Sequence, residues 1–456
     1  MKEIKAKTYL HFDNRIKYEN AKNYVENPKK VEKHSFFPFI QYTSSFERYD
    51  RNKGKRPVKI KERTIMYAAH LDGFIYSYYG RQLNTSYDKW VLENDIDECS
   101  IAYRDNKVGK CNIDFAAELI NQICESKGCF IMVGDYKNFF ETLNHSILKE
   151  RLKEVLSVNE LRKDWYQVYK SVTKYRYIEK DLINKKFGKD GQIKEKIRND
   201  KKERLKTGVK ERIKWSYFQT YPEFRGFIRN CGVNLNTSAK GIPQGTAMSA
   251  ILANVYMTKL DQQIKNLVTS HKGIYRRYSD DFIIVIPRNA SNTRKTFQKI
   301  KESTESLIGE SGLTLQTTKT KIYAFQENMI FNLETSQRTA IDYLGFVFDG
   351  ATVRMRQKSP YKFYRKAYQR IEIAKKRSIE KDTKKMLYRG DIYNLYSDRG
   401  IGREPYGNFI TYAMRSQRVF DRVCDTNNLM MNQIKNREQK IRKKMRMYKN
   451  QTLHAE

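Results

Sequence analysis

Two adjacent aspartates are the first residues of this chain whose spacing could do chemistry. Asp280 and Asp281 stand between residues 274–278 and 282–286, two short runs of strand formers that predict a β-hairpin with both carboxylates at its turn. Like charges this close raise each other's pKa and destabilise the fold unless a cation neutralises them. Taken alone, however, the pair is better explained as an ordinary turn, because Asp is a common turn former.

A third carboxylate makes a metal site the stronger interpretation. Asp135 follows residues 129–133, an apolar run that predicts a buried strand. Hard oxygen ligands select Mg²⁺, and three carboxylates at neighbouring strand ends would hold two ions about 3.5–4 Å apart. Because consecutive strand residues point to opposite faces, the turn must re-aim one aspartate of the pair. We expect Asp280 to be the stronger ligand and Asp281 the weaker.

The charge of the chain predicts a polyanionic partner. Its 456 residues include 89 Lys and Arg against 52 Asp and Glu, a formal net charge of +37. Nucleic acid is the expected partner, since each neutralised phosphate releases counterions. No stretch approaches the roughly 18 apolar residues of a membrane span, and the N-terminus lacks the apolar run of a secretion signal. We therefore expect no membrane partner and a cytoplasmic location.

Helical spacing is predicted at three places before the hairpin. Apolar residues recur at three- and four-residue steps over residues 63–78, after a break at residues 53–57. Asp114 is expected to cap a helix over residues 115–124, and residues 136–155 return to helical spacing. The six cysteines show no C-x-x-C pair, so we expect them to be reduced and mostly buried.

Basic segments follow in the second half of the chain. Residues 174–214 are dense in charge with Lys and Arg in excess, which fits a solvated helical hairpin or mobile loop at least as well as a nucleic-acid clamp. Residues 241–254 predict a turn and then a helix of small residues, and residues 343–350 predict another hairpin segment. From Lys362 onward we expect basic helices that end in a solvated tail, residues 436–456.

Five motifs follow one another between about residues 60 and 350: D-x-x-x-F-F-x-x-x-x-H-x-x-L at Asp135 to Leu148, G-I-P-Q-G-x-x-x-S at Gly241 to Ser249, Y-x-D-D at Tyr278 to Asp281, L-N-x-x-K-T at Leu315 to Thr320 and F-L-G-F at Tyr343 to Phe346. In this order they resemble the motifs of reverse transcriptases of the retron and group II intron type. Two of them depart by one residue, since Gln316 and Tyr343 replace the family's Asn and Phe.

The resemblance implies an α+β right-hand polymerase fold with fingers, a palm built on an antiparallel sheet and a helical thumb. It places an N-terminal extension and the fingers at residues 1–122, the palm at 123–349 with a basic insertion at about 174–239, and a basic helical thumb and tail at 350–456. The implied reaction is RNA-directed DNA polymerisation with two Mg²⁺ ions, for which Mn²⁺ could substitute. The implied partners are an RNA template, dNTPs and the DNA product.

Individual roles also follow from the resemblance. Asp135, Asp280 and Asp281 are the implied catalytic metal ligands, together with the backbone carbonyl of Tyr136. Lys319 matches a lysine proposed to protonate the departing pyrophosphate, with an exposed structural lysine as the alternative. Phe140 matches a steric gate against the ribose 2′-hydroxyl, with a core role as the alternative. The other implied substrate-binding residues are Gln244 and Gly245 beside the nascent base pair, Arg104 and Arg63 on the triphosphate, and Tyr278.

The subgroup is inferred from two short segments and from what is missing. Residues 100–104 and 356–365 resemble the bacterial abortive-infection and defence-associated reverse transcriptases, which implies antiphage defence with a structured noncoding RNA. No C-x-x-C zinc segment, V-T-G triplet or RNase H pattern is found. The alternatives are a retron or group II intron-type enzyme, a non-catalytic RNA-binding scaffold, and an RNA-dependent RNA polymerase. Template, primer and oligomeric state, including a homo-oligomer, stay open.

Overall fold

Three β-sheets carry the fold in the part of the chain that the computed structural model describes, residues 4–49, 58–207, 213–383, 385–403 and 407–452. The largest has six strands in the order β10-β9-β8-β3-β7-β6, and all neighbours in it are antiparallel. This sheet confirms the predicted α+β class. Its strands are β3 (Gly128–Asp135), β6 (Ile274–Tyr278), β7 (Asp281–Pro287), β8 (Lys321–Gln326), β9 (Met329–Asn332) and β10 (Arg338–Thr339).

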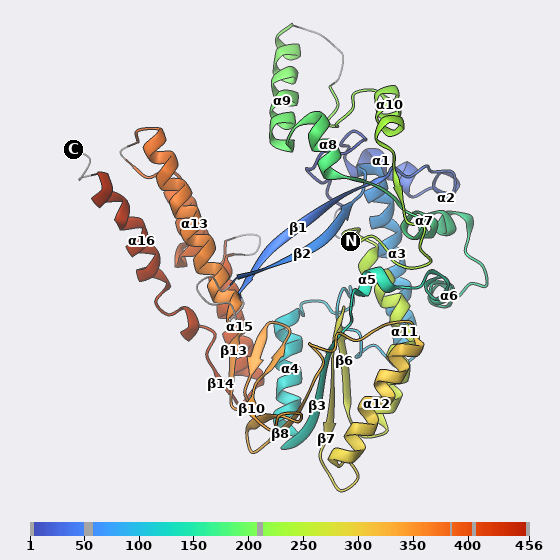
Figure 1. Cartoon of the computed structure of the whole chain (residues 1–456), viewed down its shortest axis with the longest axis vertical. Helices are drawn as coiled ribbons and strands as arrows, with labels where there is room; N and C mark the ends of the chain where they lie inside the picture. The colour runs from blue at the N-terminus through green and yellow to red at the C-terminus, as the bar shows by residue number, and fades with distance from the viewer. Residues whose placement is uncertain (1–3, 50–57, 208–212, 384, 404–406, 453–456) are drawn as a thin grey trace.

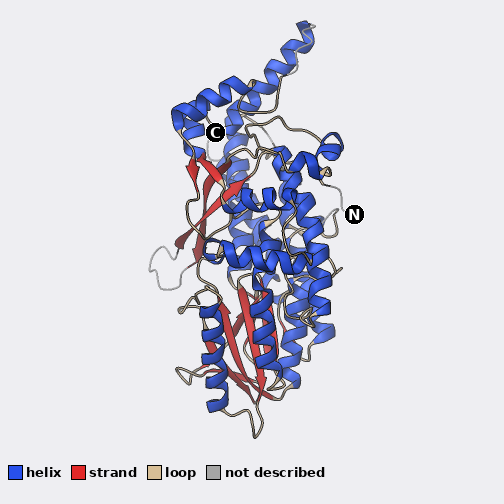
Figure 2. Cartoon of the chain, turned by 90° about the vertical axis from the view of Figure 1, so that its right-hand side faces the viewer, coloured by secondary structure: helices blue, strands red, loops and turns tan. Residues whose placement is uncertain are grey.

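The six-stranded sheet is buried on both faces, which explains the unbroken apolar run in β3. Phe130 and Met132 enter one hydrophobic core, whereas Cys129 and Ile131 enter the other. Helices cover both sides of the sheet (Figure 2). The first core includes α3 (His70–Glu93), α6 (His145–Leu156), α7 (Lys163–Thr173), α11 (Ser249–Thr269) and α12 (Arg294–Glu310); the second includes α4 (Asn112–Glu125), α13 (Lys358–Glu380) and α15 (Phe409–Val423).

A small sheet joins the second core to the C-terminal helices. It has the order β11-β12-β13-β14, and the hairpin segment predicted at residues 343–350 falls within it. Figure 1 shows α13 and α16 standing together at one side of the molecule. The elements here are β11 (Ile341–Tyr343), β12 (Phe346–Phe348), β13 (Thr352–Met355), α14 (Arg389–Tyr396), β14 (Asn427–Asn428) and α16 (Arg437–Thr452).

The predicted basic insertion is built onto the N-terminal part of the chain. Strand β4 pairs in parallel with β1, which places Tyr177 opposite Phe39, in a sheet of order β2-β1-β4-β5. A third core joins Leu10 and Phe12 to insertion residues such as Phe227. The elements are α1 (Tyr18–Val25), α2 (Pro28–Val31), β1 (Phe39–Tyr49), β2 (Val58–Tyr67), β4 (Arg176–Glu179), α8 (Lys180–Phe187), α9 (Asp190–Thr207), α10 (Tyr221–Cys231) and β5 (Asn234–Leu235).

The insertion is therefore neither a simple solvated hairpin nor a loop over its described residues. Ile183 in α8 and Ile197 in α9 are buried. Arg198 and Lys201 lie over the ring of Trp215, at 5.8 and 5.7 Å from its centroid. Residues 208–212 lie outside the described chain. The predicted domain boundaries stay a prediction, although the pairing of β1 with β4 and the third core join the insertion to residues of the predicted N-terminal part.

The helix predicted over residues 63–78 is wrong over residues 63–69. Residues up to Tyr67 belong to β2, which pairs with β1 along its whole length, and α3 begins only at His70. Pairing with a neighbouring strand outweighs the local periodicity here. Asp13 marks the true start, because its carboxylate accepts the backbone N–H groups of His70 and Leu71 at 2.9 Å each. The predicted break at residues 53–57 lies outside the described residues.

Three smaller predictions are also corrected. Asp114 is not the N-cap of α4; Cys111 is, and Asp114 completes the capping box by accepting the N–H of Cys111. Residues 136–155 form two helices, α5 (Phe139–Thr142) and α6, because Asn144 is extended and caps α6. In the predicted tail, residues 437–452 form α16, whose Ile441 and Met445 are buried rather than solvated, and residues 453–456 lie outside the described chain.

Two expectations about the bulk of the chain can be compared with the structure. All six cysteines are free, as expected, but only three of them, Cys99, Cys129 and Cys424, are buried; two are partly buried and Cys231 is exposed, so the expectation that most are buried holds for half of them. None of the helices in the described ranges is long and apolar enough to cross a membrane.

Candidate active site

The pairing of β3 with β7 brings the three predicted carboxylates to one end of the central sheet. Asp135, the last residue of β3, lies directly opposite Asp281, the first residue of β7. The backbone N–H of Tyr136 donates to the carbonyl oxygen of Asp280 at 3.1 Å. Asp135 therefore lies at the same end of the sheet as Asp280 and Asp281, from which it is separated by about 145 residues of sequence.

The turn between β6 and β7 solves the alternation problem posed by two consecutive aspartates. Ser279 has a φ of 61°, a left-handed conformation that is costly for a residue other than glycine. Asp280 follows it outside both strands, whereas Asp281 is already part of β7. The two carboxylates are thus not related by regular strand alternation. Which of them is the stronger ligand stays a prediction.

Lys319 lies beside the carboxylate of Asp135. Its Nζ atom is 2.6 Å from Oδ1, and its side chain is 42% exposed. The segment after α12 reaches this position by pairing with the end of β3: Gln316 donates its N–H to the carbonyl of Asp135, and Lys137 donates to that of Thr314, both at 2.8 Å. An accessible ammonium group beside the carboxylates is compatible with proton delivery.

The electrostatics of the hairpin tip are unfavourable without a cation. Asp281 keeps a solvent-exposed edge, yet surrounding protein atoms and the negative charges of Asp280 and Asp135 raise its pKa from 3.8 to about 7. The positive charge of Arg356 opposes this rise more weakly, and its guanidinium pairs with Asp342. The chain holds these carboxylates together at a cost.

The carboxylate oxygens at the tip of the β6–β7 hairpin are suitable ligands for a divalent cation. Carboxylate oxygens are the hard ligands that Mg²⁺ prefers, and bound charge would relieve the repulsion at Asp281. In the described ranges, no three His, Cys, Asp or Glu side chains already surround a metal position, and Asp135 faces Lys319 instead. Asp135, Asp280 and Asp281 are the residues that would hold an ion, and Tyr136 lies beside them.

The predicted Gly-Ile-Pro-Gln-Gly loop bridges β2 and the segment after Asp135. Met66 of β2 donates its N–H to the carbonyl of Gln244 at 2.8 Å. Gly245 has a φ of 121°, and a Cβ atom there would meet the Met66 carbonyl oxygen at 2.5 Å. Only glycine permits this approach. On the other side, Ile242 donates to the carbonyl of Phe140 at 2.9 Å, so the loop and Phe140 are held together.

Phe140 and Phe139 differ in burial as the gate interpretation requires. Phe139 is 4% exposed in the core, whereas Phe140 is half-buried and meets the ring of Phe139 edge-on at 5.5 Å. His145 supports the same region structurally, because its Nε2 contacts the carbonyl oxygen of Gly241 at 2.7 Å. Phe140 therefore keeps an accessible face, and its role as a gate stays a prediction.

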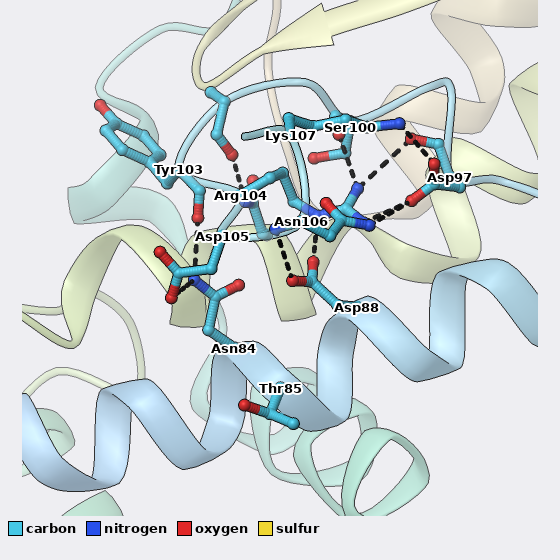
Figure 3. Close-up of polar contacts among 12 residues, drawn as sticks. Asn84, Thr85, Asp88, Asp97, Ser100, Tyr103, Arg104, Asp105, Asn106 and Lys107 are labelled. Atoms are coloured by element: carbon cyan, nitrogen blue, oxygen red, sulfur yellow. Dashed lines mark hydrogen bonds and ion pairs between the residues drawn. The ribbon is translucent and has the colours of Figure 1, made fainter. Parts of the chain in front are cut away.

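Arg104 is surrounded by protein groups rather than presented to a ligand. Its side chain is fully buried, pairs with Asp88 and Asp97, and donates to the Ser100 carbonyl at 2.8 Å (Figure 3). Lys107 also pairs with Asp97. The two carboxylates leave the guanidinium engaged within its own loop, so this geometry favours a structural role over the predicted contact with a triphosphate.

The two remaining predicted substrate residues lie on strands. Arg63 is exposed on β2, opposite Ser44 of β1. Tyr278 ends β6 opposite Asp281 and is half-buried, with its ring 6.4 Å from that of Tyr103. The structure therefore places Tyr278 at the carboxylates. No contact joins Arg63 to them among the described residues.

A buried arginine next to the signature was missed by the sequence reasoning. Arg277 on β6 is 0% exposed and pairs with Asp261 of α11, also 0% exposed. Its guanidinium also donates to the carbonyl of Ser279, within the turn. The sequence signal for it was a charged residue within a predicted strand whose other residues, such as Tyr275, are core residues. A charge buried there needs a partner of opposite charge elsewhere in the chain.

One comparison with known proteins covers part of this site. The family model described as reverse transcriptase (RNA-dependent DNA polymerase) matches residues 192–348, which include the β6–β7 hairpin and Lys319. The chain thus contains a reverse transcriptase domain. This domain indicates an RNA-directed DNA polymerase, which is a nucleotidyltransferase, and a polymerase fold of the predicted right-hand class. No curated protein matches the chain.

Several solved structures are similar to the chain at low identity. Apo telomerase from Candida tropicalis, truncated from its C-terminal domain, has a TM-score of 0.41 and 12% identity, with 74% of this chain and 59% of that chain covered. Telomerase from Candida albicans with a fragment of telomeric RNA has a TM-score of 0.41 and 10% identity, covering 96% and 71%. The RNA-dependent RNA polymerase of a human picorbirnavirus has 0.34 and 12%, covering 69% and 43%. The chain thus spans 59% of the first of these structures.

Replacing Asp281 should make the protein without metal more stable and weaken its response to Mg²⁺. Because its pKa is raised to about 7, the folded chain holds a proton that the unfolded chain releases. The stability from this group is therefore complete below about pH 4 and lost as the pH rises through 7. At pH 8 we expect Asp281→Asn to melt a few degrees higher than wild type without Mg²⁺, and Mg²⁺ to raise the Tm of this variant less than that of wild type.

Thermal unfolding at pH 6 and pH 8, with and without Mg²⁺, measures both effects. Asp391→Asn, an exposed carboxylate on α14, is the control and should respond to Mg²⁺ as wild type does. Equal stabilisation of Asp281→Asn and wild type by Mg²⁺ would place the ion elsewhere.

Proposed function

We propose that this chain is a reverse transcriptase that uses two divalent ions held by Asp135, Asp280 and Asp281 to extend DNA on an RNA template. One observation carries the proposal: within a chain that contains a reverse transcriptase domain, the β3–β7 register sets Asp135 opposite Asp281 at the tip of the Y-x-D-D hairpin. When bound, the ions would activate a 3′-hydroxyl and neutralise the triphosphate, with Mg²⁺ the expected metal and Mn²⁺ a substitute.

The residues around the carboxylates have distinct parts in this reaction. Lys319 Nζ, held 2.6 Å from Asp135, delivers a proton to the departing pyrophosphate. Gln244 and Gly245 form the surface beside the nascent base pair, where the missing side chain of Gly245 lets the backbone approach. Phe140, joined to this loop through Ile242, blocks the 2′-hydroxyl of a ribonucleotide.

The RNA partner is proposed to be a structured noncoding RNA that acts in antiphage defence. RNA binding is supported by a formal charge of +37 and by the basic surface of the C-terminal helices, whereas the defence role is supported by the resemblance of residues 100–104 and 356–365 alone. The exposed cations of α13 are Lys358, Lys362, Lys366, Arg370, Lys376 and Arg377. Such a surface binds phosphates without reading base sequence, so the shape of the RNA would decide the partner.

Removal of two carboxylates should abolish DNA synthesis. We expect Asp280→Asn/Asp281→Asn to lose at least about a thousandfold in dNTP incorporation on an RNA template, because loss of an electrostatic group at the transition state costs on this order. Glu302→Gln/Glu305→Gln, which removes two carboxylates from α12, should keep wild-type activity. Normal synthesis by the double Asp variant would contradict the metal site. Normal phage protection by it would favour the scaffold alternative.

Shortening the proposed gate should relax the choice of sugar. We expect Phe140→Ala to lower the preference for dNTPs over rNTPs by about 10–100-fold, the usual value of one steric contact. Phe139→Ala serves as the control, since it removes a buried ring of the same size without changing the preference. If both variants lose stability and neither changes the ratio of dNTP to rNTP incorporation, Phe140 is a core residue. Preference for rNTPs by wild type would indicate an RNA polymerase.

Nucleic acid that purifies with the protein should identify the template. We expect sequencing of the RNA bound to wild type from its native cells to yield one dominant structured RNA, and release of that RNA as salt rises. The reference sample is Lys362→Glu/Lys366→Glu/Arg370→Glu, whose reversed charge on α13 should leave little of it bound. A mixed RNA population that follows cellular abundance would argue against a cognate noncoding RNA.

A further inference from the structure

Arg277 joins the turn of the two aspartates to α11 and to the loop before α4. All five N–H groups of its guanidinium have acceptors. Nε donates to Asp261 Oδ1 at 2.8 Å and Nη2 to Asp261 Oδ2 at 2.6 Å. Nη1 donates to Asn254 Oδ1 and to the carbonyl of Ser279, both at 3.1 Å. Nη2 also donates to Ser100 Oγ at 3.2 Å.

The backbone of Arg277 is held as firmly as its side chain. Its N–H donates to the carbonyl of Cys99 at 2.7 Å, and its own carbonyl accepts the N–H of Ile101 at 3.0 Å. Asn254 fastens the same loop from α11, donating from Nδ2 to the carbonyl of Ala102 at 2.9 Å. Tyr275, two residues earlier on β6, donates its hydroxyl to Asp261 at 2.8 Å.

The bond to the Ser279 carbonyl has a specific consequence for the turn. Ser279 holds a left-handed φ of 61°, which a serine leaves readily unless its surroundings enforce it. Its carbonyl carbon is bonded to the amide nitrogen of Asp280, so whatever fixes that peptide plane also fixes the direction in which Asp280 leaves the turn. The guanidinium fork, held by Asp261 from the far side, supplies this constraint.

We propose that Arg277 is a positioning residue for the metal-binding turn: it aims Asp280 by fixing the Ser279–Asp280 peptide, and it couples this aim to the loop of residues 99–102. This inference rests on the proposed function, because it assumes that Asp280 binds a divalent ion. Arg277 itself touches neither ion nor nucleotide. Its effect is exerted through the left-handed turn, and Asp261 and Asn254 keep the guanidinium in place.

The test compares the affinity for Mn²⁺, used as the probe ion, in wild type, Arg277→Lys and Arg277→Lys/Ser279→Gly. Lysine keeps a positive charge for Asp261 but cannot reach Asn254, Ser279 and Ser100 at once. We expect the Mn²⁺ dissociation constant, measured by electron paramagnetic resonance without substrate, to rise about tenfold in Arg277→Lys. Ser279→Gly should recover part of that loss, since glycine adopts the left-handed conformation without strain.

Two controls separate positioning from a general loss of stability. Arg162→Lys changes another bidentate arginine, which donates to Asp164 at 2.8 and 2.7 Å and is not part of the hairpin. Val168→Ala opens a cavity in the buried face of α7. Both should lower Tm and leave Mn²⁺ affinity unchanged. If Arg277→Lys does not fold, Asn254→Ala removes one acceptor of the same Nη1 atom and should weaken Mn²⁺ binding by a smaller factor.

The outcomes distinguish the positioning role of Arg277 from the proposed polymerase function on which it rests. A folded Arg277→Lys protein with wild-type Mn²⁺ affinity would overturn the positioning role, as would a loss that Ser279→Gly does not reduce. Wild-type protein that binds no Mn²⁺ would overturn the metal site itself. Wild-type protein that binds Mn²⁺ but incorporates no dNTP would overturn the polymerase function and leave the role of Arg277 at the ion intact.

Discussion

The antiparallel pairing of β3 with β7 is the constraint from which the rest of the site follows. Both strands are apolar and buried on two faces, so a shift of register by one residue would exchange the side chains of two cores. Gly134 makes the alignment more exacting, because a Cβ atom there would overlap the ring of Phe282, its partner in β7. With that register set, Asp135 has no position available other than opposite Asp281.

The stability of the core is thus used to hold charges that repel one another. The raised pKa of Asp281 reflects this, since its carboxylate is crowded by protein atoms and by Asp280 and Asp135. Stabilisation comes from elsewhere in the same region. The pair of Arg277 and Asp261 is fully buried, and its charges and N–H groups are satisfied by one another and by polar neighbours. The charges of Arg277 and Asp261 neutralise each other, whereas those of Asp135, Asp280 and Asp281 are not fully neutralised by the protein, so the three carboxylates are suited to binding a cation.

The basic insertion shows that a segment placed within the palm by sequence order can belong to another part of the molecule. Strand β4 continues the sheet of β1 and β2, and Lys180 approaches Tyr67 of β2 and Asp190 of α9 at 3.2 and 2.6 Å. The same β2 donates from Met66 to the Gln244 carbonyl. A continuous series of contacts therefore joins the insertion, through β1 and β2, to the loop of Gln244, although more than 170 residues separate Met66 from Gln244.

Much of the site was predictable from sequence because its signals are local. The turn at Asp280 and Asp281, the strand that ends at Asp135 and the glycine loop at Gly241 to Gly245 each depend on residues within a few positions of one another. The order of these motifs was enough to indicate the class of enzyme. The predictions for Asp114 and for residues 63–78 were wrong where a neighbouring cap or strand outweighed local periodicity.

Tertiary structure decided the features that depend on distant partners. In the sequence, Arg277 is only an arginine before a tyrosine. The acceptors of its five N–H groups come from α11, the turn and the loop near residue 100, which the fold brings together. It likewise makes Arg104 a candidate for phosphate, whereas folding surrounds it with Asp88 and Asp97. The sequence by itself determined which catalytic side chains are present. Packing between distant segments determined which of the charged side chains can contact a ligand, because a charge that the fold places beside an opposite charge pairs with that group instead.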